Sequence, residues 1–290
     1  MNGIDVIYWI NLDRSQDRRQ RMTQLFQDPA FNNVEIIRFS AIDNSVTNLE
    51  TYIENKETPQ TKVEYCCLLS HMECLRLFSQ QSKHKTAMIM EDDATLDYKQ
   101  YWKSSVSEVM KNAPIGWQCL MLSYMSNNIP SELYTYNRDD HWSCLSYIVP
   151  LNSAKKIIDD CYSSYSGKYT FDPSISHEAD KYIFLKLITY VYRYPYFIYG
   201  YDETSTLDHH SAIRFHNSSR KRIDMFYENS SDYRGEEVKP FHKKINRFIA
   251  LLLFLLVLLF IAVIYIINYD LPVKSARVGV SYLFKCSKCS

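Results

Sequence analysis

The sequence predicts an α/β domain with a mostly parallel sheet. Short segments rich in β-branched and aromatic residues alternate with segments whose apolar residues recur at helical spacing. Such alternation is typical of strands joined by helices. A chain of 290 residues can hold one such domain and a small extra segment. In sheets of this class ligands bind at the carboxyl ends of strands, so polar residues there are the first candidates for a site.

The first part of the domain is expected to contain strands at 5–12, 34–39 and 86–90, a helix after Ser15 and a helix at 65–79. Segment 5–12, DVIYWINL, is rich in β-branched and aromatic residues, which is typical of a strand buried on both faces. Ser15 can cap the helix that follows it. Residues 44–62 are polar and are expected to form a loop or a short helix.

The second part is expected to contain helices at 102–110, 153–162 and 181–190 and strands at 117–123, 146–150 and 192–199. The helix at 153–162 places Ala154, Ile157, Ile158 and Cys161 on one face. From residue 205 the chain becomes polar, and we interpret 205–247 as a linker. We divide the chain into a main domain at 1–235, a basic linker at 236–247, a membrane helix at 248–268 and a tail at 269–290.

Composition narrows the class of protein. Lys+Arg and Asp+Glu both number 33, and such a balance gives no sign of nucleic-acid binding. The common Gly-rich phosphate loops are absent from the sequence. The cysteines before residue 235 have no metal-site spacing, which favours reduced thiols that pack as small apolar groups. Cys286 and Cys289 form a lone CxxC, for which we do not expect zinc and leave lipidation open.

Residues 248–267, FIALLLFLLVLLFIAVIYII, contain no charge over a length that spans a bilayer core. The segment is apolar on every face, which disfavours a buried helix of a soluble domain. Basic residues flank it on both sides, so the positive-inside rule gives little orientation. Without an N-terminal signal pattern, we expect a tail-anchored, single-pass membrane protein whose 1–247 portion faces the cytosol. Occupied sequons at Asn217 and Asn229 would reverse that orientation.

Three adjacent carboxylates, Glu91, Asp92 and Asp93, follow the strand expected at 86–90. Adjacent carboxylates repel one another, and their burial is costly without a positive charge nearby. Either water solvates this corner or a cation lies there. A hard divalent cation such as Mn²⁺ or Mg²⁺ would take these oxygen ligands and leave positions for water or phosphate.

An ordered set of motifs accompanies the triplet, namely INLDRSQDRRQRM at 10–22, AID at 41–43, EYCCLLSH at 64–71, IMEDDA at 89–94, WQCLMLSY at 117–124, SYIVPLNSAKKIID at 146–159, HEADKYIF at 177–184 and YPYFIYGYDETSTL at 194–207. The set resembles glycosyltransferase family 25, which contains lipooligosaccharide and collagen galactosyltransferases. The resemblance covers roughly residues 4–208. The chain departs from the family pattern at Cys66 and Asn44, where the family usually has glycine.

The resemblance implies a GT-A-like fold for 1–235 as the catalytic domain, a nucleotide-sugar donor, usually a UDP-sugar, and manganese-dependent inverting transfer. The acceptor would be a hydroxyl of a glycan or protein, and galactose and glucose are the candidate sugars. The triplet stands at the family's DxD-type position. Glu91 and Asp93 are then expected to hold Mn²⁺ (or Mg²⁺), and Asp92 to contact the nucleotide. His209 could complete the metal site, although the pair His209-His210 could equally be exposed.

Further candidates lie along the chain. Backbone amides and arginine near a helix start can hold a nucleotide or phosphate, although a solvated helix face is the alternative. Ser70 and His71 lie within an expected helix, where bracing the core is an equal alternative to binding. The expected nucleotide-binding residues are Asn11, Asp13, Arg14, Arg18, Ser70, His71 and Asp92.

Asp180 is our candidate for the catalytic base, because inverting transfer needs a carboxylate within reach of the acceptor hydroxyl. Asp172 and Glu178 compete for this role, and a helix N-terminal carboxylate held by the dipole is the structural alternative.

Two rival functions remain. Another metal enzyme, such as a phosphodiesterase, would need several more His and Asp ligands, and no obvious set is present. A non-catalytic, membrane-anchored binding or scaffold protein with the same fold is the other alternative.

Overall fold

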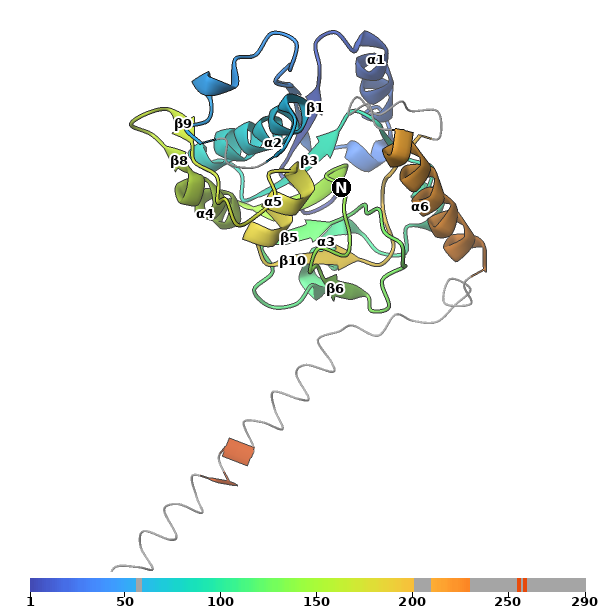
Figure 1. The fold of residues 1–290 in the computed structure, drawn as a ribbon. Coiled ribbons are helices and arrows are strands. Elements are labelled where there is room, and N and C mark those ends of the chain that lie inside the picture. The colour runs from blue at the N-terminus through green and yellow to red at the C-terminus, as the bar shows by residue number, and fades with distance from the viewer. Residues whose placement is uncertain (56–58, 201–209, 230–254, 257, 260–290) are drawn as a thin grey trace, which may run out of the picture. The chain divides into compact units, whose positions relative to one another are not determined.

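The computed structural model describes residues 1–55, 59–200, 210–229, 255–256 and 258–259 (Figure 1). The chain divides into two units, residues 1–242 and 243–290, and the fold below is that of the first. Among the described residues, no helix has both the length and the apolarity needed to cross a membrane. The span expected at 248–267 lies outside the described residues, apart from Leu255, Leu256, Leu258 and Leu259.

A seven-stranded sheet has the order β2-β1-β3-β7-β5-β10-β6. Its strands are β1 (Val6–Asn11), β2 (Glu35–Ser40), β3 (Thr86–Glu91), β5 (Cys119–Met121), β6 (Tyr134–Tyr136), β7 (Ser146–Pro150) and β10 (Thr189–Tyr192). β1 pairs in parallel with β2 and β3, and β10 pairs in parallel with β5. β7 is antiparallel to both β3 and β5, and β6 is antiparallel to β10. The predicted α/β class with a mostly parallel sheet is confirmed, with β7 and β6 running opposite to the other strands.

The helices are α1 (Gln16–Leu25), α2 (Lys62–Gln80), α3 (Val106–Asn112), α4 (Leu151–Cys161), α5 (Ala179–Lys186) and α6 (His210–Asn229). Thr61 begins α2 with a capping box, because its hydroxyl accepts from the Glu64 amide while Glu64 accepts from the Thr61 amide. Ser105 begins α3 in the same way. Ser15 precedes α1 as predicted, but its side chain makes no capping hydrogen bond.

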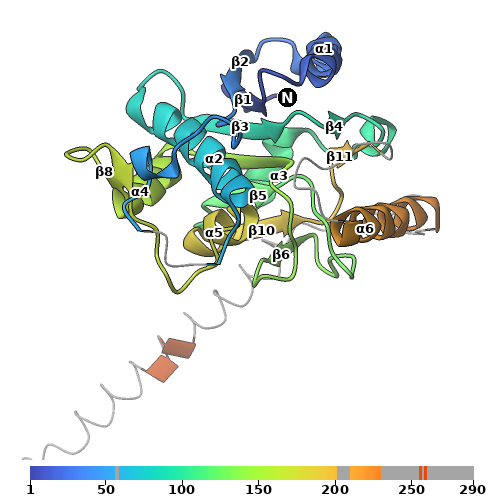
Figure 2. The same cartoon turned by 45° about the horizontal axis from the view of Figure 1, so that its top comes forward.

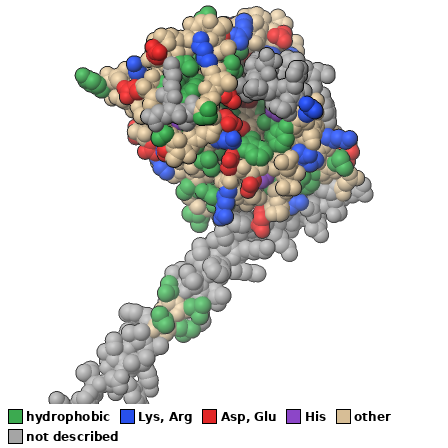
Figure 3. All heavy atoms as spheres, in the orientation of Figure 1, with side chains coloured by type: hydrophobic (Ala, Val, Ile, Leu, Met, Phe, Trp, Pro, Cys, Tyr) green, Lys and Arg blue, Asp and Glu red, His purple; other side chains and the backbone are tan. Residues whose placement is uncertain are grey.

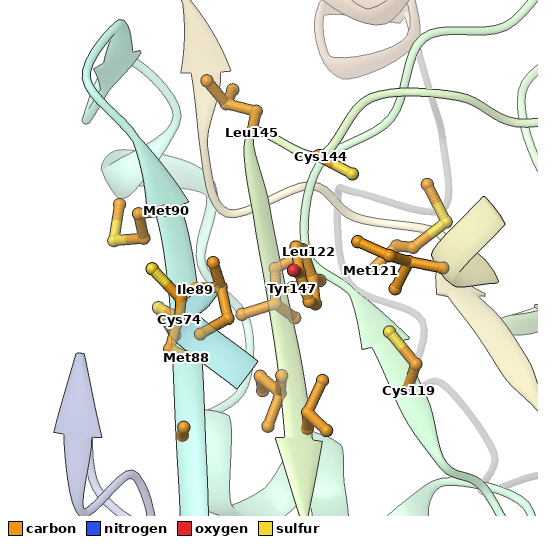
Figure 4. Close-up of a cluster of buried hydrophobic side chains, with 14 of the residues drawn as sticks. Cys74, Met88, Ile89, Met90, Cys119, Met121, Leu122, Cys144, Leu145 and Tyr147 are labelled. Atoms are coloured by element: carbon orange, nitrogen blue, oxygen red, sulfur yellow. The ribbon is translucent and has the colours of Figure 1, made fainter. Parts of the chain in front are cut away.

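The two faces of the sheet are covered by different helices, as neighbouring residues of β1 show. Tyr8 packs against Phe78 of α2, with ring centroids 6.4 Å apart, while Trp9 packs against Phe26 at the end of α1. α2 also packs against α4 and α5 (Figures 1 and 2). Figure 4 shows the core at the middle of the sheet, where side chains of β3, β5 and β7 such as Met88, Ile89 and Tyr147 lie side by side. These three are fully buried, and each apolar side chain of this size stabilises the fold by about 1.5–3 kcal/mol.

Several element boundaries differ from those expected. The helix predicted at 181–190 ends at Lys186, because Thr189–Tyr192 pairs with β5 as β10. The strand predicted at 192–199 is not continuous, because Tyr192 ends β10 and β11 (Ile198–Tyr199) pairs separately with β4 (Ala94–Thr95). The helix predicted at 102–110 begins at Val106. A further short pair joins β8 (Tyr162–Ser163) to β9 (Lys168–Tyr169).

The linker expected from residue 205 is wrong for residues 210–229, which form α6. Ser219, Ile223 and Tyr227 follow one another at four-residue spacing and are all buried, so one side of this helix packs against the domain. The ring of Tyr227 stacks on Tyr101 with centroids 4.5 Å apart. The Ser126 amide donates to the Ser219 hydroxyl at 3.0 Å. α6 therefore belongs to the same core as the sheet.

Candidate functional site

A positively charged side chain of the protein, Arg18, lies beside the acidic triplet. Asp92 is 8% exposed, and its two carboxylate oxygens have different donors. Asn11 Nδ2, at the end of β1, donates to Asp92 Oδ2 at 2.6 Å, and Arg18 donates to Asp92 Oδ1 at 2.8 Å. Since β1 and β3 are parallel neighbours, their carboxyl ends bring Asn11 and Asp92 together as the sheet topology requires.

Arg18 reaches this corner from the first turns of α1, and only 10% of its side chain is exposed. The same guanidinium lies 3.7 Å from Asp93 Oδ2. Burial by itself would lower the pKa of Arg18, but the charges of Asp93, Asp92 and Glu91 outweigh it and raise that pKa. The alternative of a solvated outer face therefore does not apply to Arg18, which is a buried positive charge facing three carboxylates.

Asp93, unlike Asp92, has a carboxylate oxygen that accepts no hydrogen bond from the described residues. Its Oδ1 atom is buried and has no hydrogen-bond partner within the described part of the chain. Burial and, next, the negative charge of Glu91 raise the pKa of Asp93 to about 7, against the opposing charge of Arg18. A carboxylate held in this way favours either a proton or an added cation.

His71 of α2 contacts Glu91, the remaining carboxylate of the triplet. Its Nε2 lies 3.1 Å from Glu91 Oε1, and its Nδ1 lies 3.1 Å from the hydroxyl of Tyr147 on β7. The neighbouring Ser70 hydroxyl accepts from the Ile42 amide at 2.9 Å and donates to the Cys66 carbonyl at 2.7 Å. Ser70 thus ties α2 to the segment after β2, while His71 touches the acidic cluster directly.

These side chains border a cavity of about 290 Å³. On the face drawn in Figure 3, acidic side chains gather beside a hollow. The predicted site residues that line the cavity are Asn11, Arg14, Arg18, Ser70, His71, Glu91, Asp92, Asp93 and Asp180. The structure therefore brings together residues from the ends of β1 and β3, from α1 and α2, and from the start of α5.

Asp180 lines the cavity from the first turn of α5. The Ser143 amide donates to Asp180 Oδ2 at 3.0 Å. Burial raises the pKa of Asp180, and this hydrogen bond opposes the shift. Ser143 has a φ of 100°, a conformation that is costly for a residue with a side chain and that recurs at functional sites. The raised pKa makes Asp180 a stronger base than an exposed aspartate.

Other expected site residues lie elsewhere. Asp13 is exposed and is not among the residues that line the cavity, because its Oδ1 accepts from Arg38 at 2.6 Å. Arg14 lines the cavity edge and pairs with Asp43. Asp172 pairs with Lys186 at 3.0 Å outside the lining. His209 lies outside the described residues.

Glu178, the other competitor of Asp180, lines the cavity and pairs with Lys181 at 3.1 Å. Cys66 lies inside α2, so the departure from glycine there is accommodated by ordinary helical backbone.

Some lining residues were not anticipated, including Cys67, Tyr199 and His216. His216 lies on α6, and burial lowers its pKa while the charge of Glu91 opposes that shift. An isolated histidine on a polar segment gives no signal in the sequence, since only packing of α6 brings it to the cavity. Cys67 belongs to the EYCCLLSH motif, whose i and i+4 spacing to His71 is a signal that could have been used.

The residues present fit a hard divalent cation. Glu91 and Asp93 offer carboxylate oxygens at one corner of the cavity, and the unbonded Asp93 Oδ1 is the atom that a cation would satisfy. A buried imidazole and Arg18 surround the same corner, so the site can hold an anionic ligand together with a cation.

The sheet and its cavity place this chain in the class of α/β domains whose ligand site lies at the carboxyl ends of the strands. Residues 4–175 match the family model described as glycosyltransferase family 25 (LPS biosynthesis protein). The chain belongs to glycosyltransferase family 25.

Relatives by sequence are distant. Procollagen galactosyltransferase 2 of Homo sapiens is 25% identical over 175 residues, which cover 54% of this chain and 28% of the human protein. A glycosyltransferase 25 family member of Aedes aegypti is 24% identical over 176 residues, with the same coverage. The match thus spans little more than a quarter of these relatives' own length.

Similar solved structures include A197 from STIV, with a TM-score of 0.35 and 11% identity over 71% of this chain and all of that one. A glycosyltransferase involved in the glycosylation of the major capsid of PBCV-1 has a TM-score of 0.32 and 8% identity, over 75% of this chain and all of that one. Scores at this level do not define a shared fold.

Proposed function

We propose that this chain transfers a sugar from a nucleoside diphosphate sugar, most simply a UDP-sugar, to a hydroxyl of a glycan or protein acceptor on a GT-A-like scaffold. The observation that carries the proposal is Asp93, a carboxylate with a buried, unbonded oxygen and a pKa of about 7 at a cavity that also holds Glu91 and Arg18. Family membership supports the reaction class, and the name of the human relative makes galactose the first sugar to test.

The donor would lie at the ends of β1 and β3. Arg14 and Arg18 border this part of the cavity with positive charge, as a diphosphate requires. Asn11 donates to Asp92, and Asp92 in turn accepts from Arg18 and holds it in place. Asp92 therefore positions the arginine, and its own oxygens already have donors.

Glu91 and Asp93 would hold Mn²⁺ or Mg²⁺, and His216 is the late histidine that lines the same cavity. When bound, the cation supplies charge neutralisation for the diphosphate leaving group. Arg18 adds a fixed positive charge that is in place without metal. His71, braced by Tyr147, orients Glu91.

Asp180 would accept the proton of the acceptor hydroxyl. Its raised pKa increases its basicity, and the Ser143 amide fixes the position of its carboxylate. The hydroxyl oxygen, once its proton passes to Asp180, would attack the sugar carbon while the nucleoside diphosphate leaves.

The test uses the full chain with UDP-galactose, UDP-glucose and other nucleotide sugars, with Mn²⁺, Mg²⁺ or chelator, and measures UDP release and nucleotide binding. Cation-dependent UDP release that is lost in Asp93→Asn but kept in the exposed control Asp159→Asn supports the enzyme. Nucleotide binding without turnover toward any donor or acceptor would instead favour a scaffold. Absence of any cation-assisted nucleotide binding would refute the proposal.

We also propose that residues 248–267 anchor the chain in a membrane with residues 1–247 on the cytosolic side. The length and apolarity of that segment support the anchor. Protease added to intact microsomes should then digest residues 1–247. Protection of that portion, or glycan on Asn217 or Asn229, would refute this orientation.

A further inference from the structure

Three side chains of different chemistry meet where α2 passes the end of β3. The thiol of Cys67, the imidazole of His71 and the carboxylate of Glu91 each offer a ligand atom, and these atoms all lie within 4.8 Å of one another. We propose that they form a binding site for a thiophilic divalent cation of the Zn²⁺ class, separate in selectivity from a carboxylate site for Mn²⁺.

The fold positions this trio through secondary structure. Cys67 and His71 are four residues apart, so they lie on the same face of α2, one turn from each other. Glu91 is the last residue of β3, which α2 contacts. Because α2 is a long helix with a capping box at its start, the two ligands it carries are held on rigid backbone.

The spacing is close to what zinc needs. A tetrahedral zinc ion with bonds of about 2.0–2.3 Å holds its ligand atoms roughly 3.3–3.8 Å apart. His71 Nε2 and Glu91 Oε1 are 3.1 Å apart, and the whole set falls within 4.8 Å. Cys67 lines the cavity, so its thiol faces the same space as the other two ligand atoms.

Tyr147 prepares the imidazole for this role. Its hydroxyl lies 3.1 Å from His71 Nδ1 and donates to it while Nε2–H donates to Glu91. When a cation takes the place of the Nε2 proton, the other tautomer lets Nδ1–H donate to the same hydroxyl. Metal-binding histidines usually have such an oxygen partner on the second ring nitrogen, which fixes the tautomer and the ring orientation. Tyr147 is fully buried, so water does not compete for this hydrogen bond.

The ligand types select the metal. Thiolate and imidazole favour Zn²⁺ or Co²⁺ over Mn²⁺, which prefers oxygen ligands. Binding converts the Cys67 thiol to thiolate and releases its proton to solvent. The cavity leaves the remaining coordination position open to water or to a ligand. Glu91 would be shared with the proposed manganese site, so, if the proposed function holds, zinc should also inhibit transfer.

The test uses the full chain in which Cys286 and Cys289 are replaced by serine, since that CxxC could bind zinc independently. Zinc affinity is measured by competition with a fluorescent chelator, and Co²⁺ is used to look for the near-ultraviolet thiolate-to-cobalt band. The variants are Cys67→Ser and the matched control Cys66→Ser, which changes the adjacent cysteine of the same helix and cavity. Tyr147→Phe tests the support of the imidazole.

We expect one zinc per chain, a thiolate–cobalt band, and loss of both in Cys67→Ser but not in Cys66→Ser. Tyr147→Phe should weaken zinc binding by about 10–100-fold. In the protein with Cys67 intact, zinc should also slow alkylation of Cys67, as followed by mass spectrometry, which does not depend on a variant folding. Equal zinc affinity in Cys67→Ser, or unchanged alkylation of Cys67 with zinc, would overturn the proposal. Neither readout requires turnover, so a failed transferase assay leaves this test intact.

Discussion

Replacing Asp93 by asparagine should make the metal-free protein more stable at neutral and alkaline pH. The pKa of Asp93 is raised from 3.8 to about 7 in the fold, chiefly by burial and then by Glu91. Between these pH values the folded state holds a proton that the unfolded chain has released, so stability falls as the pH rises from about 4 to 7. Above pH 7 the loss is complete and changes no further.

The magnitude follows from the same shift. An interval of about three pKa units corresponds to at most roughly 4 kcal/mol at 1.36 kcal/mol per unit. Asparagine is nearly isosteric and carries no charge, and Asp92 remains as the partner of Arg18 at 2.8 Å. The gain in unfolding free energy should therefore be near zero at pH 4, grow to a few kcal/mol by pH 7, and then level off.

Urea unfolding of the full chain, in nonionic detergent with chelator, measures this at several pH values from 4 to 8. The exposed control Asp159→Asn should show no gain that varies with pH. Mn²⁺ should stabilise the unsubstituted protein at pH 8 and have little effect on Asp93→Asn, because bound ligand adds RT ln(1 + [L]/Kd) to stability. A destabilised Asp93→Asn at pH 8, or a gain that is independent of pH, would refute the electrostatic reasoning.

Other predictions concern single side chains. Arg18→Met should destabilise the fold by about 3–5 kcal/mol at pH 7 in urea unfolding, since Asp92 is left buried without its cation. Asp180→Asn should lower sugar transfer at least about 10²-fold and leave nucleotide binding within a small factor, as calorimetry would show. Thr61→Ala should lower stability by about 0.5–2 kcal/mol through loss of the α2 cap. Gly3→Ala should lower the melting temperature, because Gly3 has a φ of +93° and a Cβ there would lie 2.6 Å from Met110; an unchanged melting temperature would contradict this.

Regular periodicity made the main strands and helices predictable. Segment 5–12 is rich in β-branched and aromatic residues, which predicts a doubly buried strand, and every residue of β1 is buried in the structure. In α2, Leu68, Met72 and Leu75 recur on one face, which predicts a helix. The failures lie where tertiary pairing overrides local pattern. Residues 187–190 continue an apolar helical pattern, but pairing with β5 extends Thr189–Tyr192 instead.

The acidic corner was predictable in position and only partly in chemistry. A carboxylate triplet after an apolar strand indicates a strand end, and parallel pairing of β1 with β3 places Asn11 beside it. The sequence does not reveal that Arg18 neutralises Asp92, because that contact joins α1 to the residue after β3. His216 depends on the packing of α6, and its approach to the cavity has no local signature.

The place of β7 between β3 and β5 has a consequence for synthesis on the ribosome. β3 ends at Glu91, but its antiparallel partner β7 begins only at Ser146. The edge of β3 that pairs with β7 therefore stays unpaired until the intervening residues have been synthesised. At about 5–20 residues per second this delay is roughly 3–11 s. During it an apolar strand, with Met88 and Met90, has an open edge that other nascent chains could pair with. Chaperone capture early in translation should therefore concentrate on the segment around β3.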